Sequence, residues 1–404
     1  MGLTIRLSIR TLCYILAIAM VLLTLDILLV ISFGRQKTKV SQKSGLSQAT
    51  LSNGVKVGGT VAVSINRPVE KSEFSNDTKQ VQEAPVVGKA SIVVEKAEDH
   101  RTLLESPDVP CSAGRSRNRM LNLYGEKFNV SIPPFMNMDF ESQPHIQDLP
   151  FPFGVQKSAS LVKQTLGILS NSSLPAISTR KSCLRCVIVG NGGILKDTSL
   201  GKVIDNFDVV LRINSAPTKG YEKDVGTKTT VRMCYPESAF LKPEQYQGDW
   251  LLLLMVFKPL DLTWVQTVSQ GKKMTNQKGF WKKIASSVPK KPKDFRILNP
   301  SILRETGFDI IGFTIPENGK VGKNVPTSGC LAIMLALRFC DEVAVAGFGY
   351  DTSVPNAPLH YYDKLKMKEI NRSWTHSVAN EQKTLFELVD QGVLQDLTGG
   401  LTRS

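Results

Sequence analysis

The sequence from about residue 149 to residue 404 predicts an α/β fold with a mostly parallel sheet flanked by helices. Two observations carry this prediction. Short apolar runs alternate along the chain with helical patterns, an order typical of a parallel sheet covered on both faces. The first run, VIVG at 187–190, ends in a glycine-rich turn, and ligands of such folds bind at the carboxyl ends of the strands. About 255 residues can bury a single core of this kind.

The elements of this region follow from its apolar runs. Six runs are interpreted as buried strands, and they lie at 187–190, 208–214, 229–233, 250–257, 295–299 and 342–348. Four helices are predicted between and after them, at 279–287, 301–311, 328–340 and 376–391. The sequence shows no internal repeat.

The amino-terminal residues predict a membrane anchor. Residues 11–33 read TLCYILAIAMVLLTLDILLVISF, and at about 1.5 Å per residue they span roughly 34 Å, enough for a hydrocarbon core of about 30 Å. Asp26 costs roughly 3 kcal/mol, whereas the Leu, Ile, Val and Phe residues together gain about 7 kcal/mol, so insertion is favoured. The alternative, a cleaved signal peptide, would have a shorter apolar region and a small-residue cleavage site, and neither is evident. Residues 1–10 would then be a short tail.

The orientation of this anchor is ambiguous from the residues alone. Basic residues follow the span more densely than they precede it, which favours a cytosolic carboxyl side. Four N-x-S/T sequons favour the opposite, because they have meaning only if the body is lumenal, although single triplets occur by chance. The sequons begin at Asn76, Asn129, Asn171 and Asn371.

Residues 34–148 predict a largely flexible stem, because their Ser, Gln, Lys, Gly and Pro residues show no sustained helical or strand period. The whole chain has a globular composition, with 42% apolar and 21% charged residues. Its net charge of +14 suggests anionic partners without choosing among them. Residues 271–293 hold eight Lys and no acid. They lack a nucleic-acid-binding motif, so a solvated basic face or attraction to an anionic substrate or membrane is favoured over nucleic-acid binding.

The segment CLRCVIVGNGG, Cys183 to Gly193, joins a strand to a turn that lets backbone approach a ligand closely. The dinucleotide fingerprint fails because Leu195 stands where its third Gly or Ala is expected, which weakens a nicotinamide-dependent enzyme. Cys183 and Cys186 have the spacing of half a zinc site or a redox pair. No second CxxC supplies four zinc ligands, so disulfides to distant cysteines are favoured for a lumenal protein. Cys234 and Cys330 are interpreted as buried thiols.

Two further segments contain groups suited to phosphate binding and proton transfer. In NVPTSGCLAIMLALRFCDEVAVAGFGY, residues 324–350, a helix opens near Thr327 and Ser328. Its free N–H groups suit a phosphate, although simple capping is the alternative. The body has only two histidines, His360 in HYYD and His376 in HSVANE. A neutral imidazole is a fitting base for a sugar hydroxyl, contributing roughly 10²–10⁴ in rate, and a capping or core His is the alternative.

Taken together, four segments resemble the four ordered sialyl motifs of animal sialyltransferases, over roughly residues 149–404. They are Cys183–Met233, Asn324–Tyr350, HYYD and HSVANE. NSAPTKGYEKDVGTKTT and PLHYYD are most similar to the β-galactoside α-2,3 branch. Within it, SWTH and AVAGFGYDTSVPNAPLHYY resemble N-acetyllactosaminide enzymes, and the terminal DLTGGL resembles lactosylceramide enzymes. The balance of these similarities favours the N-acetyllactosaminide enzymes.

This resemblance implies a Rossmann-like variant of the GT-A fold without the usual acidic metal motif. It implies inverting transfer of sialic acid from CMP-sialic acid to the 3-hydroxyl of a terminal β-galactose, with no metal or other cofactor. The partners implied are the donor, a β-galactoside glycan acceptor and the Golgi membrane, with residues 149–404 as a lumenal catalytic domain behind a type II signal anchor. A non-catalytic, membrane-tethered sugar-binding protein is the alternative from another class.

The resemblance also assigns roles to residues. His376 matches the family's base, and His360 matches the His that contacts the donor phosphate. The disulfide of the family is matched by Cys186 and Cys340, and Cys183 with Cys111 is a second candidate bridge. The expected donor-binding residues are Asn191, Asn214, Thr327, Ser328, Gly329 and Gly349, with Tyr235 expected to line the site. The stem matches no pattern of the family.

Overall fold

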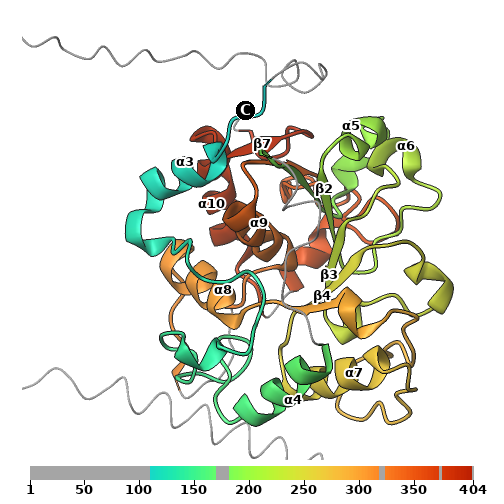
Figure 1. Ribbon diagram of the computed structural model, residues 1–404. Coiled ribbons are helices and arrows are strands. Elements are labelled where there is room, and N and C mark those ends of the chain that lie inside the picture. Colours follow the sequence, from blue (N-terminus) through green and yellow to red (C-terminus); the bar gives the residue numbers. More distant parts are fainter. Residues whose placement is uncertain (1–109, 170–181, 318–323, 373–374, 403–404) are drawn as a thin grey trace, which may run out of the picture. The chain divides into compact units, whose positions relative to one another are not determined.

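The computed structural model describes residues 110–169, 182–317, 324–372 and 375–402 (Figure 1). The predicted tail, the span 11–33 and most of the predicted stem lie outside these residues, as do the sequons at Asn76 and Asn171. Over the described ranges, no helix is both long enough and apolar enough to cross a membrane.

A parallel sheet forms the centre of the described structure. Its seven strands follow the order β5-β4-β3-β2-β1-β6-β7, and every neighbouring pair is parallel. The chain therefore moves outward from β1 to β5 and then returns to the other side of β1, which creates a switch point between β1 and β6. The strands are β1 (Arg185–Val189), β2 (Val209–Ile213), β3 (Val231–Cys234), β4 (Leu251–Leu254), β5 (Phe295–Ile297), β6 (Glu342–Ala346) and β7 (Leu394–Asp396).

Helices cover both faces of the sheet because successive strand residues point to opposite sides. Ile188 packs in a core with α3, α8, α9 and α10, whereas Val187 packs in a second core with α5 and α6. A third core joins α4 and α7 to β4 and β5, and Figure 1 shows these groups around the sheet. The helices are α3 (Arg115–Tyr124), α4 (Ala159–Leu169), α5 (Gly201–Asp205), α6 (Glu222–Val225), α7 (Pro259–Ser269), α8 (Pro300–Arg304), α9 (Ser328–Phe339) and α10 (Val378–Asp390).

Helix α9 is the central helix of the first core. Its sequence SGCLAIMLALRF is apolar on nearly all sides, and Leu331 to Leu337 are at most 1% exposed. A helix that is apolar all round belongs in a protein interior. Thr327 caps its first turn, since the hydroxyl oxygen accepts a hydrogen bond from the Cys330 N–H at 3.3 Å.

The predicted sheet is confirmed, and three predictions about elements need correction. The segment 279–287 forms no helix. Its Gly279 has φ +91°, and its buried end is held by irregular hydrogen bonds instead, from Trp264 Nε1 to the Ala285 carbonyl and between the Gln277 amide and the Ile284 backbone. The predicted helix 301–311 begins as α8 and continues as a π-helix, Glu305–Ile310. The predicted helix 376–391 begins at Val378, so His376 precedes it.

The predicted stem boundary at residue 148 lies inside folded structure. Helix α3 buries Met120 completely, and Phe128, Phe135 and Phe140 are at most 2% exposed. Their spacing follows neither the helical nor the strand period, because most of this segment crosses the surface of the core as irregular chain. Buried aromatic residues in irregular chain leave no periodic signal.

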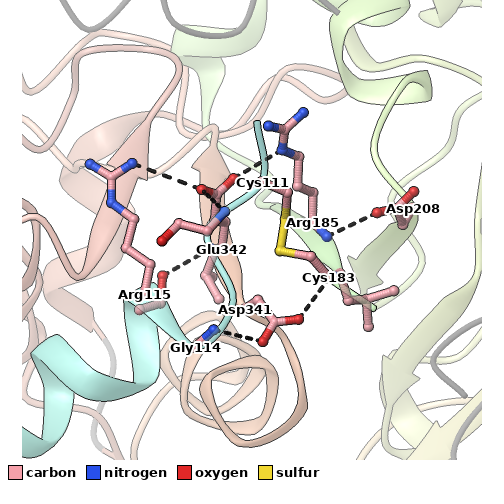
Figure 2. The surroundings of a disulfide bond; sticks show 12 residues. Cys111, Gly114, Arg115, Cys183, Arg185, Asp208, Asp341 and Glu342 are labelled. Carbon is pink, nitrogen blue, oxygen red and sulfur yellow. Dashed lines mark hydrogen bonds and ion pairs between the residues drawn. A yellow bond between two sulfur atoms is a disulfide. The ribbon is translucent and has the colours of Figure 1, made fainter. Parts of the chain in front are cut away.

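Both expected disulfides are present, and one of them attaches the start of this segment to the sheet. Cys186 on β1 bonds Cys340 after α9, and Cys111 bonds Cys183 before β1, each with Cα atoms 6.0 Å apart. Figure 2 shows the second bridge beside Asp341, whose carboxylate accepts from the backbone N–H groups of Gly114 and Leu184. Cys234 and Cys330 are buried thiols, in line with their interpretation from sequence.

Two sequons fall within the described chain. Asn129 is exposed, and its side-chain oxygen accepts a hydrogen bond from the Ser131 N–H at 2.9 Å. Asn371 lies on the 3-10 turn Met367–Arg372. Glycan attachment at either position stays a prediction.

Candidate active site

A cavity of about 790 Å³ lies at the carboxyl ends of the strands. Its walls come from the residues that follow β1, β2, β3, β4 and β6, together with the start of α9 and the approach to α10. This is the edge where parallel α/β folds bind ligands. All nine residues predicted for catalysis or donor binding line it, namely Asn191, Asn214, Tyr235, Thr327, Ser328, Gly329, Gly349, His360 and His376.

Backbone contacts at the switch point explain the glycines. The N–H of Gly192 donates to the Gly347 carbonyl at 3.0 Å, and a Cβ on Gly190 would lie 2.5 Å from that same oxygen. Gly349 has φ +92°, and its Cβ would lie 2.0 Å from the Gly400 carbonyl oxygen. The turns after β1 and β6 therefore pack backbone on backbone, which only glycine allows.

Two asparagines of the cavity lining have amide oxygens without a hydrogen-bond partner among the described residues. Asn191 is 8% exposed, and Asn214 holds a left-handed backbone with φ +56°. The Oδ1 atom of each is buried and has no hydrogen-bond partner among the described residues. Because buried polar atoms are nearly always paired, these two oxygens suit the N–H or O–H groups of a ligand.

His360 is held in one orientation from both sides. Its Nδ1 lies 2.7 Å from Asp363 Oδ2, and its ring stacks on Tyr362 with centroids 5.3 Å apart. The backbone also pairs with Gly192 across an isolated bridge. Since a carboxylate only accepts, Nδ1 carries the hydrogen, and Nε2 is the atom left for a ligand.

His376 is arranged as a neutral base. Its Nδ1 donates to the Val325 carbonyl oxygen at 2.7 Å, and a carbonyl can only accept, so the lone pair of the neutral ring is on Nε2. Burial lowers the pKa of His376, although the bond to Val325 opposes this. The imidazole is therefore unprotonated near neutral pH, as a general base requires.

The start of α9 is tied to α10 through a buried carboxyl group. The Thr327 hydroxyl donates to Glu381 Oε2 at 2.6 Å, and the Thr327 N–H donates to the same carboxylate. Glu381 is 3% exposed, and burial raises its pKa to about 7 even though the bonds from Thr327 oppose the shift. The Thr327 hydroxyl is already engaged as donor and acceptor, so its role is to position Ser328 and Gly329.

Of the second wall of the cavity, sequence reasoning found only Tyr235. Tyr235 after β3 meets Phe257 after β4 edge to face at 5.1 Å, and burial raises the pKa of Tyr235 to about 12. Glu237, Lys258 and Trp281 also line the cavity. The available signal was position, because Glu237 and Lys258 come just after strands that end at this edge.

Across the residues that the structure describes, no group of three or more His, Cys, Asp or Glu side chains could hold a metal ion.

The fold and the cavity together define an α/β protein with a parallel sheet flanked by helices, whose candidate ligand site lies at the switch point of that sheet. The family profile of glycosyltransferase family 29 (sialyltransferase) matches residues 135–393, and the chain belongs to this family. The protein is a sialyltransferase. The match also begins upstream of residue 149, in agreement with the folded segment described above.

Relatives with two different names match this chain. The human protein named CMP-N-acetylneuraminate-beta-1,4-galactoside alpha-2,3-sialyltransferase is 44% identical over 293 residues, covering 72% of this chain and 77% of the relative. The rat protein named lactosylceramide alpha-2,3-sialyltransferase is 41% identical over 307 residues, covering 75% of this chain and 79% of the relative.

A solved structure shares the fold. The crystal structure of a mammalian sialyltransferase in complex with Gal-beta-1-3GalNAc-ortho-nitrophenol matches with a TM-score of 0.54 and 24% identity. The match covers 73% of this chain and 100% of that chain.

Proposed function

We propose that this sialyltransferase moves sialic acid from CMP-sialic acid to the 3-hydroxyl of a terminal β-galactose on N-acetyllactosamine-type glycans, with inversion. The observation that carries the proposal is the cavity itself, where a neutral imidazole, an oriented second imidazole and two unpaired amide oxygens share one lining. The relative named for β-1,4-galactosides, at 44% identity, supports the acceptor.

The chemistry is a single displacement. The galactose oxygen attacks the anomeric carbon of sialic acid while the bond from that carbon to the phosphate oxygen breaks, and one displacement inverts the centre. His376 Nε2 takes the proton of the attacking hydroxyl, because Nδ1 is held by the Val325 carbonyl. The product is the sialylated galactoside, and CMP leaves with the electron pair.

The departing phosphate needs hydrogen-bond donors. In the proposed complex His360 contacts the phosphate as an imidazolium, in which both ring nitrogens donate: Nδ1 donates to Asp363 and Nε2 to the phosphate. The N–H groups at the start of α9 also favour an anion. Asn191 and Asn214 supply amide groups to the donor. The groups proposed to bind the donor substrate are amides, hydroxyls and an imidazole, and the reaction is proposed to need no metal.

A second candidate acceptor is lactosylceramide, favoured by the rat relative of that name at 41% identity. The terminal DLTGGL segment also suggested it. In the fold, however, Gly400 packs against Gly349, and the Thr398 hydroxyl accepts from the Gly347 N–H at 3.2 Å. The segment supports the glycine turn, so its similarity says little about the acceptor, and N-acetyllactosamine is preferred.

The proposed location is the Golgi membrane, with a type II signal anchor at residues 11–33 and the catalytic domain in the lumen. Two disulfides between distant residues support an oxidising compartment. Protease protection of the full chain in sealed Golgi vesicles tests this orientation, and cleavage of the body without detergent would contradict it.

The function is tested with the parent and His376→Ala on an acceptor panel of N-acetyllactosamine and lactosylceramide, with linkage analysis of the product. We expect α-2,3 product on N-acetyllactosamine and a loss of about 10²–10⁴ in kcat for the variant. A chelator should leave turnover unchanged. Near-parental turnover of the variant would exclude His376 as the base, and sugar binding without transfer by the parent would favour the non-catalytic alternative.

A further inference from the structure

The turn after β2 carries one of the two proposed donor asparagines, and the neighbouring strand β3 fixes its backbone. Asn214 directly follows β2 and lines the cavity with a left-handed backbone of φ +56°. Its N–H donates to the Met233 carbonyl at 2.8 Å, and its carbonyl accepts from Arg232 Nη1 at 2.7 Å. Both backbone polar groups of Asn214 are therefore held by β3.

Arg232 also holds the next part of this turn. The same Nη1 atom donates to the Ala216 carbonyl at 3.1 Å, and the guanidinium carbon lies 4.4 Å from the centroid of the Phe240 ring. Arg232 is 3% exposed, and it is not among the residues that line the cavity. It therefore touches no ligand in the cavity and acts through the residues that it holds.

The burial of this guanidinium opposes folding. Arg212 on β2 is the register partner of Arg232 and is itself 2% exposed, so two cations share one face of the sheet. Neither forms an ion pair with a carboxylate among the described residues. Arg232 Nε is buried without a partner in the same set. Buried charges are nearly always paired, so an apolar residue would suit the core better, and what Arg232 provides is its hydrogen bonds to the turn.

The position of the Asn214 amide depends on that turn. Residues other than glycine rarely adopt a positive φ, so surrounding contacts must hold Asn214 in it. Within the described chain, its Oδ1 atom is buried and has no hydrogen-bond partner. The backbone that Arg232 fixes therefore determines where the amide oxygen lies in the cavity.

We infer that Arg232 is a positioning residue for the nucleotide-sugar donor. Its two hydrogen bonds hold residues 214–216 in the conformation that presents the Asn214 amide to CMP-sialic acid. This inference rests on the proposed function, and it deepens it by assigning part of the donor affinity to a residue outside the cavity lining.

The first test compares the donor and acceptor KM values of Arg232→Met with those of the parent. Met is unbranched and apolar, and it leaves the Asn214 and Ala216 carbonyls without their donor. The KM for CMP-sialic acid should rise about 10- to 100-fold, the range of a lost hydrogen bond to a charged group. The KM for N-acetyllactosamine should stay within about twofold. An unchanged donor KM, or an equal rise in both values, would overturn the role.

A conservative variant keeps the test valid if Arg232→Met does not fold. Arg232→Lys keeps the charge and one donor group but replaces the planar fork with a single ammonium. We expect its donor KM to rise less, about three- to tenfold, with the acceptor KM at the parental level. Equal rises in both KM values of Arg232→Lys would contradict the inference.

The matched control is Arg296→Met. Arg296 on β5 is also 3% exposed, and its Nη1 donates to the Lys293 and Phe295 carbonyls. None of these three residues lines the cavity. The donor KM of Arg296→Met should be parental. A rise as large as that of Arg232→Met would mean that loss of any buried arginine has this effect, and the assignment to Arg232 would be wrong.

A double-mutant cycle asks whether Arg232 acts through Asn214. Asn214→Gly removes the amide and tolerates the positive φ. In this background, Arg232→Met should raise the donor KM by less than about twofold further, because the group that Arg232 positions is already gone. Full multiplication of the two single effects would show that the guanidinium acts on the donor independently, and it would overturn the positioning role.

A binding measurement separates this inference from the proposed function. Titration with CMP-sialic acid in the absence of acceptor reports donor affinity whether or not transfer occurs. A parent that transfers sialic acid while Arg232→Met keeps the parental donor affinity contradicts only the role of Arg232. A parent that binds the donor but transfers nothing to any galactoside contradicts the proposed function itself.

Discussion

The buried carboxyl group of Glu381 predicts an unusual pH dependence of stability. Its pKa is raised from 4.5 to about 7 by burial. Between about pH 4.5 and pH 7, the folded protein holds a proton on Glu381 that the unfolded chain has released. The stabilisation from this group is therefore complete below about pH 4.5 and is lost as the pH rises through 7. At 1.36 kcal/mol per pKa unit, the shift corresponds to about 3 kcal/mol.

The perturbation is Glu381→Gln, which keeps an acceptor for the Thr327 hydroxyl and N–H but cannot ionise. We expect the variant to be less sensitive to pH than the parent. The difference in the free energy of unfolding, variant minus parent, should rise by about 3 kcal/mol between pH 4.5 and pH 8. Other buried acids such as Asp261 and Glu305 titrate in both proteins and cancel in the difference.

The assay is urea unfolding of both proteins at several pH values from 4.5 to 8, followed by tryptophan fluorescence. If the free energies of unfolding of the two proteins differ by a constant amount over the whole pH range, Glu381 does not titrate near pH 7. It would then be an ionised carboxylate that accepts hydrogen bonds from Thr327. A falling difference would mean that Thr327 stabilises the charged form more than burial opposes it.

Three further predictions concern the base, the glycine turn and a disulfide. Because burial lowers the pKa of His376, the acidic limb of the pH profile of kcat/KM should have its midpoint below pH 6.5. A midpoint above pH 7 would argue against this base. Gly349→Ala should be more destabilising than Gly271→Ala in thermal unfolding. Both glycines have positive φ, but only the Cβ added to Gly349 would meet a neighbouring atom, at 2.0 Å. Equal losses of stability would mean that only the backbone strain of positive φ, roughly 1–3 kcal/mol, acts at both positions. Cys186→Ser should cost about 2–5 kcal/mol in unfolding, peptide mapping of the parent should link Cys186 to Cys340, and an unchanged melting temperature would contradict a structural role.

Much of the sheet was predictable because its strands are buried on both faces and form continuous apolar runs. The sequence located the first six strands for this reason, and it missed β7 because LQD is short and lies at the edge of the sheet. The folded segment around α3 was missed because Met120, Phe128 and Phe135 are buried from chain without a regular period.

The candidate site was likewise predictable only in part. Residues of the sialyl motifs stand beside glycines and strand ends, where the sequence already indicates a ligand edge. Glu237 and Lys258 also follow strand ends, but the sequence does not distinguish a buried ion pair from surface charge, so position was the only signal for them. Trp281 lay in a basic run that suggested a helix and a solvated face, whereas the structure turns its ring toward the cavity rim.

Leu401 is fully buried and contributes to the floor of the cavity, and Asp396 fixes it by accepting from its N–H at 2.6 Å. Deletion of the residues after Asp396 should therefore open this side of the cavity while leaving both imidazoles in the chain.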